Sequence, residues 1–83
     1  DYQCPYCSVT APVIETLIEE FKSDLCFVYR HFPMKNIHPV AELAALAGEA
    51  ADQQGKFWEM HRLLFKNSAS LNSENIGLYA RSL

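Results

Sequence analysis

Apolar side chains recur at helical spacing over residues 4–21, and this pattern predicts an amphipathic helix there. Pro5 fits the first helical position, where a missing N–H costs no hydrogen bond, whereas Pro12 lies inside the helix and should kink its axis. The predicted apolar face comprises Val9, Val13, Ile14, Leu17, Ile18 and Phe21. Such a face needs a partner, because most helical stability in proteins comes from burying it.

A second pattern, alternation with a period of two, predicts a strand over residues 25–32. Both of its sides are largely apolar, which is typical of a central strand covered on both faces. One side would carry Leu25, Phe27, Tyr29 and His31, and the other Cys26, Val28, Arg30 and Phe32. A single strand cannot satisfy its own backbone N–H and C=O groups, so we interpret the chain as a fragment that needs partner strands.

The rest of the chain is predicted to be helical. Residues 39–54 have an alanine-rich face and end at Gly55, a natural terminator. Residues 56–66 place apolar side chains at i, i+3, i+4 and i+7, and Asn72 is expected to cap a last helix. The predicted order is therefore helix, strand, helix, helix, helix.

Composition narrows the classes of function. With 83 residues, 49% of them hydrophobic, the chain suffices for one domain with a modest core. A net charge of -3 argues against a nucleic-acid partner, which requires a basic face. We expect no membrane span, because no apolar stretch approaches the ~20 residues that a spanning helix needs. No signal peptide is visible, so the first residues do not indicate a compartment.

The candidate chemistry lies in Cys4-Pro5-Tyr6-Cys7, at the start of the first predicted helix. The N-terminus of a helix stabilises a thiolate, so the pKa of Cys4 should fall below the usual ~8.5. Cys7, one turn on, lies within disulfide reach and should be shielded. We therefore predict that Cys4 attacks and that Cys7 resolves the mixed disulfide. Pro5 should keep the turn rigid, and Tyr6 is placed to influence the redox poise.

Other interpretations of the cysteines and histidines remain open. A single C-x-x-C pair could be half of a zinc site, with ligands from His31, His38 or His61, or a structural disulfide that closes only a short loop. Cys26 is expected to be a buried small hydrophobe, and His61 a hydrogen-bonded core histidine. Tyr2 could either contact a substrate beside the thiols or pack in the core.

The segment DYQCPYC at residues 1–7 resembles the active-site segment of the DsbA-like thiol:disulfide oxidoreductases of bacteria. The resemblance continues through YRHFP at residues 29–33, His38-Pro39 with the alanine-rich helix, and QGKFWEMH at residues 54–61, and it reaches Tyr79-Ala80. Glutaredoxins share C-P-Y-C. The long helical stretch, however, resembles the insertion that DsbA-like proteins carry within a thioredoxin fold.

This resemblance implies an α/β, thioredoxin-like fold with a helical insertion, incomplete here. Residues 1–83 would be a partial domain, with the active-site helix and central strand in residues 1–33 and the insertion in residues 34–83. The family's cis-proline loop and its buried acidic residue would lie outside these residues.

The resemblance also implies an enzyme, a protein disulfide oxidoreductase in the periplasm or elsewhere outside the cytoplasm. Its partners would be protein substrates with cysteines and a redox partner protein. The Cys4–Cys7 disulfide would be the redox group, with no metal or organic cofactor. A glutaredoxin-like reductase and a non-enzymatic zinc-binding or structural module are the alternative functions. The open strand predicts that the fragment either self-associates through this strand or is ordered only as part of a longer chain.

Overall fold

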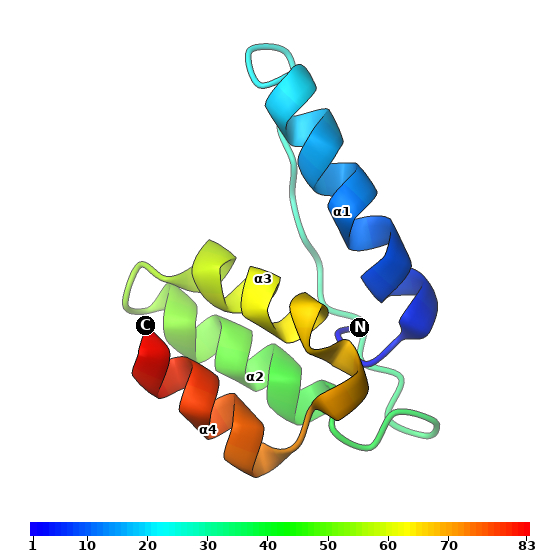
Figure 1. Ribbon diagram of the computed structural model, residues 1–83, viewed down its shortest axis with the longest axis vertical. Helices are drawn as coiled ribbons and strands as arrows, with labels where there is room; N and C mark the ends of the chain where they lie inside the picture. Colours follow the sequence, from blue (N-terminus) through cyan, green and yellow to red (C-terminus); the bar gives the residue numbers. More distant parts are fainter.

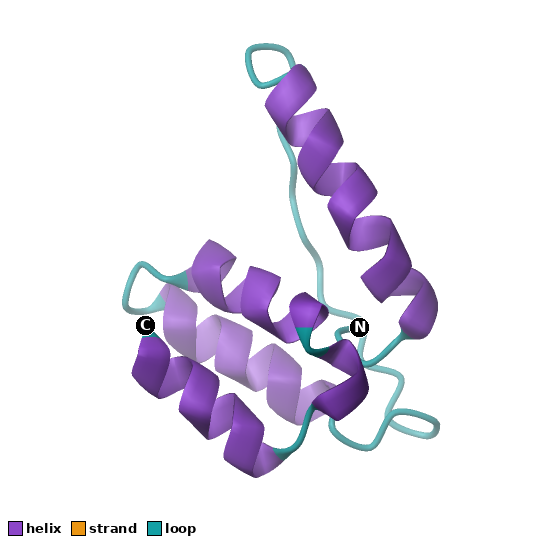
Figure 2. Ribbon diagram, viewed as in Figure 1, coloured by secondary structure: helices purple, strands orange, loops and turns teal.

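The computed structural model describes all 83 residues and contains four α-helices and one short 3₁₀ helix. These are α1 (Pro5–Glu20), α2 (Ala41–Asp52), α3 (Phe57–Lys66), η1 (Ser68–Ser70) and α4 (Ser73–Ser82). Figures 1 and 2 show α1 and the extended segment after it projecting away from the other helices. We call residues 5–34 the arm and residues 41–82 the bundle.

The predicted α/β, thioredoxin-like fold is wrong, because the structure is all-helical and residues 25–32 form no strand. These residues are extended, yet none of their backbone groups makes a main-chain hydrogen bond. Alternation survives within the segment, where Phe27, Tyr29 and His31 are half-buried and the residues between them are exposed. A period-two pattern sets the direction of side chains, but a strand also needs a neighbour for its ladder.

The predicted helices are confirmed, with small shifts at their ends. The cap of the last helix is confirmed as well, because Asn72 Oδ1 accepts a hydrogen bond of 2.8 Å from the backbone N–H of Asn75. This bond satisfies one of the donors that a helix N-terminus leaves unpaired. Local capping and helical periodicity were therefore sufficient to predict the three α-helices of the bundle, although not η1.

The bundle core lies where α3 meets α2 and α4. Leu64 and Met60 of α3 are buried there, and α2 faces them with small residues such as Ala44 and Ala51. Small side chains let two helices approach closely, so a short bundle can exclude water. Ile76 of α4 covers the remaining side.

Two glycines, one inside α2 and one just after it, should respond differently to alanine. Gly55 follows the C-terminus of α2 and has a positive φ of 70°. This conformation lets the N–H of the next residue, Lys56, donate a hydrogen bond of 2.8 Å to the carbonyl of Ala51. A side chain disfavours this left-handed conformation, so Gly55→Ala should lower the free energy of unfolding by about 1 kcal/mol. A Cβ on Gly48 would lie 3.4 Å from a Phe57 ring carbon, an ordinary contact.

Gly48→Ala should consequently leave stability unchanged or raise it by up to about 1 kcal/mol, because alanine favours a helix interior over glycine. Urea unfolding of the two variants beside the unmodified chain measures both effects. A larger loss from Gly48→Ala than from Gly55→Ala would contradict this assignment.

Candidate functional site

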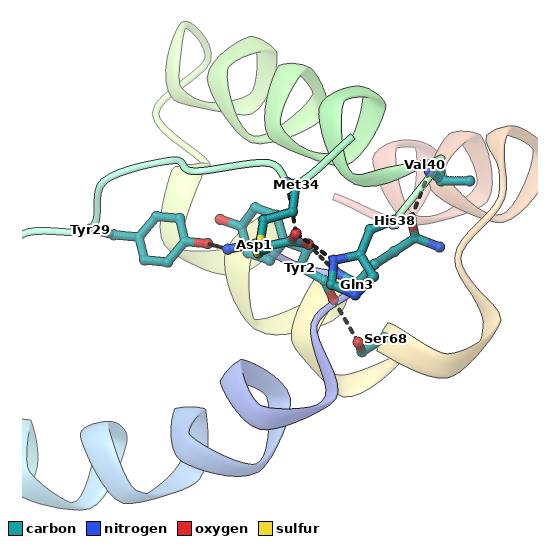
Figure 3. Close-up of polar contacts among 8 residues, drawn as sticks. All are labelled: Asp1, Tyr2, Gln3, Tyr29, Met34, His38, Val40 and Ser68. Carbon is teal, nitrogen blue, oxygen red and sulfur yellow. Dashed lines mark hydrogen bonds and ion pairs between the residues drawn. The ribbon is translucent and has the colours of Figure 1, made fainter. Parts of the chain in front are cut away.

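The position of Asp1, three residues before Cys4, is fixed by its side-chain carboxylate. Asp1 has only 3% of its side chain exposed. Its Oδ2 accepts a hydrogen bond of 2.9 Å from the N–H of Met34 and lies 2.6 Å from Nδ1 of His38, and its Oδ1 accepts one from the N–H of Gln3 (Figure 3). A buried carboxylate needs such partners, because each unpaired charge costs several kcal/mol. Asp1 therefore joins the start of the chain to the loop before α2.

Two further bonds hold the same segment. Gln3 Oε1 accepts a hydrogen bond of 2.6 Å from the N–H of Val40, and the carbonyl of Tyr2 accepts one of 2.6 Å from the hydroxyl of Ser68 (Figure 3). The first contact reaches the start of α2 and the second reaches η1. Residues 1–3 are thus tied to three separate parts of the chain, and this fixes the position from which α1 begins.

Tyr2 is fully buried and anchors the segment in an aromatic cluster. Its ring stacks on Tyr29 at 5.3 Å and packs at 4.7 Å from Phe65, and its hydroxyl lies 2.9 Å from Nδ1 of His61. Burial lowers the pKa of His61 to about 4 and raises the pKa of the Tyr2 hydroxyl. At neutral pH the hydroxyl therefore donates to a neutral imidazole. The prediction of a hydrogen-bonded core histidine at His61 is confirmed, and Tyr2 packs in the core.

The two predicted thiols lie together in the first turn of α1, both half-buried and both free. Cys4 occupies the N-cap position in an extended conformation, with φ of -70° and ψ of 121°. The backbone N–H of Cys7, its thiol and the N–H of Tyr6 all favour the Cys4 thiolate, and together they hold the pKa of Cys4 below its usual value against partial desolvation. Burial, followed by the Cys4 contact, raises the pKa of Cys7.

An apolar hollow of about 280 Å³ opens beside Cys7. It is lined by Tyr6, Cys7, Thr10, Ala11, Ile14, Tyr29 and Phe65. Burial raises the pKa of Tyr29 to about 12, so its hydroxyl stays protonated beside the thiols. The hollow therefore offers an apolar group a place next to the Cys7 sulfur.

The opposite pKa directions of the two thiols predict an order of reactivity. In a Cys26→Ser background, a limiting amount of iodoacetamide at pH 7 should label Cys4 at least about tenfold faster than Cys7, because the thiolate is the nucleophile. Mass spectrometry of the digested chain measures the two rates. Cys7→Ser should leave Cys4 reactive. Equal labelling of both thiols would overturn the assignment of Cys4 as the attacking residue.

The other predicted positions are placed as follows. Pro5 takes the first helical position, and the Tyr6 side chain between the thiols is exposed. Cys26 was predicted to be buried, and this is wrong because it is exposed in the extended segment. The structure brings no group of three or more His, Cys, Asp or Glu side chains together as metal ligands, so the zinc interpretation finds no support. The contact of Asp1 with His38 escaped sequence reasoning, because no periodicity relates the two residues.

Comparison with known proteins gives matches over the whole chain. Na(+)/H(+) antiporter NhaA 1 of Salinispora arenicola is 41% identical over all 83 residues. Na(+)/H(+) antiporter NhaA 1 of Mycolicibacterium vanbaalenii is 44% identical over 80 residues, and Na(+)/H(+) antiporter NhaA of Herminiimonas arsenicoxydans is 36% identical over 83. No protein-family model matches the chain, and no solved structure matches it.

The chain spans 13% of the length of each of these curated relatives. Their names thus describe polypeptides far longer than the matched part. They contradict the identification as a DsbA-like oxidoreductase, because relatives matching the full chain are named cation antiporters. The C-P-Y-C motif describes one helical turn, and it does not specify the polypeptide that carries the turn.

The same comparison corrects the other functional predictions. A protein disulfide oxidoreductase, a glutaredoxin-like reductase and a zinc or structural module all conflict with the antiporter name. The predicted partners, protein substrates and a redox partner protein, conflict with this name as well, and so does the predicted periplasmic location. The name also conflicts with the expected lack of a membrane span. Among the helices described here, none combines the length and the apolar character needed to cross a bilayer.

Three predictions have not been tested by these observations. The first is that Cys4 attacks and Cys7 resolves, with Pro5 and Tyr6 as the dipeptide between them. The second is that the Cys4–Cys7 disulfide is the redox group and that no metal or organic cofactor is needed. The third is the division of the chain into residues 1–33 and residues 34–83.

Proposed function

We propose that this chain is a segment of a Na+/H+ antiporter polypeptide, lying outside the bilayer, and that it modulates cation/proton exchange through the thiols of Cys4 and Cys7. The observation that carries the proposal is the 41% identity over all 83 residues to Na(+)/H(+) antiporter NhaA 1 of Salinispora arenicola. Because the match covers 13% of that protein, ion exchange is assigned to the longer polypeptide and modulation to this segment.

The charges on α1 support a place in water. Glu15, Glu19 and Glu20 fall within less than two turns of the helix, and the last two are exposed. A charged residue at the centre of a spanning helix costs about 2.5–3.5 kcal/mol. Two exposed carboxylates on this helix therefore favour water over lipid.

The thiol pair supplies a reversible covalent change. The Cys4 thiolate would attack a small disulfide and release one thiol, and Cys7 would then attack the Cys4 sulfur and release the second thiol. The small disulfide is reduced to two thiols, the pair is oxidised to one disulfide, and the two thiol protons pass to the leaving groups. The pKa directions of Cys4 and Cys7 support this order of events.

The experiment uses everted membrane vesicles that contain the longer polypeptide with this segment. Sodium-driven proton movement is followed by dequenching of acridine orange fluorescence, after treatment with a dithiol reductant or with a small disulfide. We expect the exchange rate to differ at least about twofold between the two treatments, and Cys4→Ser with Cys7→Ser should abolish the difference. Cys26→Ser is the matched control and should preserve it.

Each negative result has a distinct meaning. Absence of sodium-driven proton movement in every sample would overturn the antiporter assignment. Normal exchange with equal rates under both treatments would overturn the role of the thiols.

A further inference from the structure

The chain exposes more surface than a folded monomer of its mass normally does. Its accessible surface is 5806 Å², and only 12 of its 83 residues are buried. A monomer of 9.4 kDa exposes about 5,000 Å². The excess of about 800 Å² equals one partner's share of a standard protein interface. An excess of this size is enough to accommodate one partner surface.

Much of this exposed apolar surface lies on α1. The helix has no buried residue. Ala11, Ile14 and Ile18 are half-buried on the side toward the rest of the chain. A second stripe, which we call the outer stripe, is between 40% and 75% exposed. It consists of Val9, Val13 and Leu17 of α1 and of Phe21, the residue that caps the helix C-terminus. Its members recur every four residues, so they share one face of the helix and present a continuous apolar strip.

The extended segment carries the second part of the surface. Leu25, Val28 and Phe32 are 45–76% exposed, and the backbone groups of residues 25–32 form no main-chain hydrogen bond. Figure 1 shows this segment running from the tip of α1 back toward the bundle. Extended backbone with unpaired N–H and C=O groups beside apolar side chains is a template for pairing with another extended chain.

We propose that the outer stripe and residues 25–32 form one docking surface, and that its occupant is another segment of the same polypeptide, outside residues 1–83. This inference rests on the proposed function for the existence of the longer polypeptide, of which this chain would be 13%, as in its relatives. A tethered partner acts at an effective concentration in the millimolar range, so it occupies the surface ahead of partners in solution.

The charges of the chain argue against a membrane surface and against a second copy of the chain as the occupant. Helices that lie on membranes carry several Lys and Arg beside their apolar face. The far end of this arm carries three carboxylates, those of Glu19, Glu20 and Asp24, against one cation. That cation is Lys22, which pairs with Glu19 at 3.5 Å. A second copy of the chain would bring together two bodies of net charge -3, at a concentration far below that of a tethered segment.

Hydrogen exchange of backbone amides, read by mass spectrometry, tests the proposal. In the isolated 83-residue chain the amides of residues 26–32 should exchange without protection, and in the longer polypeptide at least about 100-fold more slowly. Val13→Asp and Val28→Asp should remove this protection. Gln53→Asp, which introduces the same charge at an exposed position just after α2 in the bundle, should retain it. Unchanged exchange in α3 shows that each variant is folded.

Three outcomes would overturn the proposal. Unprotected amides in the longer polypeptide would show that nothing covers the surface. Protection of the isolated chain that rises with concentration, together with sedimentation as a dimer, would assign the surface to a second copy. Protection that appears only with phosphatidylcholine or phosphatidylglycerol vesicles would assign it to lipid. None of these readouts depends on ion exchange, so failure of the antiporter assignment is distinguishable.

Discussion

Replacing Tyr2 with alanine should lower the free energy of unfolding by about 3–5 kcal/mol, since it removes a fully buried ring from the aromatic cluster. The loss is large for a chain of this size, whose total stability is expected to be about 4–12 kcal/mol. Tyr2 also joins two parts of the structure, because its ring contacts Tyr29 of the arm and Phe65 of the bundle. Urea unfolding followed by circular dichroism measures the change.

Tyr2→Phe separates the ring from its hydroxyl. It keeps the packing and leaves Nδ1 of His61 without its partner at 2.9 Å, so it should cost about 1–2 kcal/mol. Tyr79→Phe, a change at a half-buried ring beside the same core, is the matched control and should have a smaller effect. A loss below 1 kcal/mol for Tyr2→Ala would show that the cluster does not depend on this ring.

Acidification should destabilise the chain between about pH 6.5 and pH 4 through His61. Burial lowers the folded-state pKa of His61 to about 4, whereas the unfolded chain has the ordinary value of about 6.5. Below pH 6.5 the unfolded state therefore binds a proton that the folded state does not, and stability falls as the pH falls until both states are protonated near pH 4. The expected loss between pH 7.5 and pH 4.5 is about 2–3 kcal/mol.

The matched variant is His61→Asn, which keeps an acceptor near the Tyr2 hydroxyl and cannot titrate in this range. Its free energy of unfolding should change by about 2–3 kcal/mol less than that of the unmodified chain over the same pH interval. The carboxylate of Asp1 beside His38 is present in both proteins, so its contribution cancels in the comparison. Parallel pH profiles would show that His61 is not the responsible group.

Helical periodicity and capping act over a few residues, which is why the bounds of α2, α3 and the Asn72 cap followed from the sequence. The strand at residues 25–32 did not, because its existence depends on a neighbour that periodicity cannot supply. The same limit applied to Cys26, whose predicted burial assumed a covered second face. Sequence patterns predicted side-chain direction in this segment, and they could not predict what lies against it.

The candidate site shows the same division. Cys4 and Cys7 lie together because two residues separate them at a helix start, a purely local relation. The contact of Asp1 with His38 joins residues 37 positions apart, and only the folded chain brings them together. The similarity to the antiporters extends over all 83 residues, so a motif of four residues could indicate thiol chemistry without indicating the protein that contains it.

The hydrogen bonds of residues 1–3 fix one end of α1 and leave its other end freer to move. The thiol end of α1 is fixed by the hydrogen bonds of Asp1 and Gln3 and by one of 3.2 Å from the Ser8 hydroxyl to the Phe65 carbonyl. Beyond Pro12, the ion pair between Glu15 and Arg62 is the one polar link of α1 to the bundle. Pro12 lacks the N–H that would bond to Ser8, so it is the natural pivot. A rotation of about 10° there would move Glu20, about 12 Å away along the axis, by about 2 Å. The sulfurs would stay in place, so a pull on the tip leaves the thiol geometry unchanged.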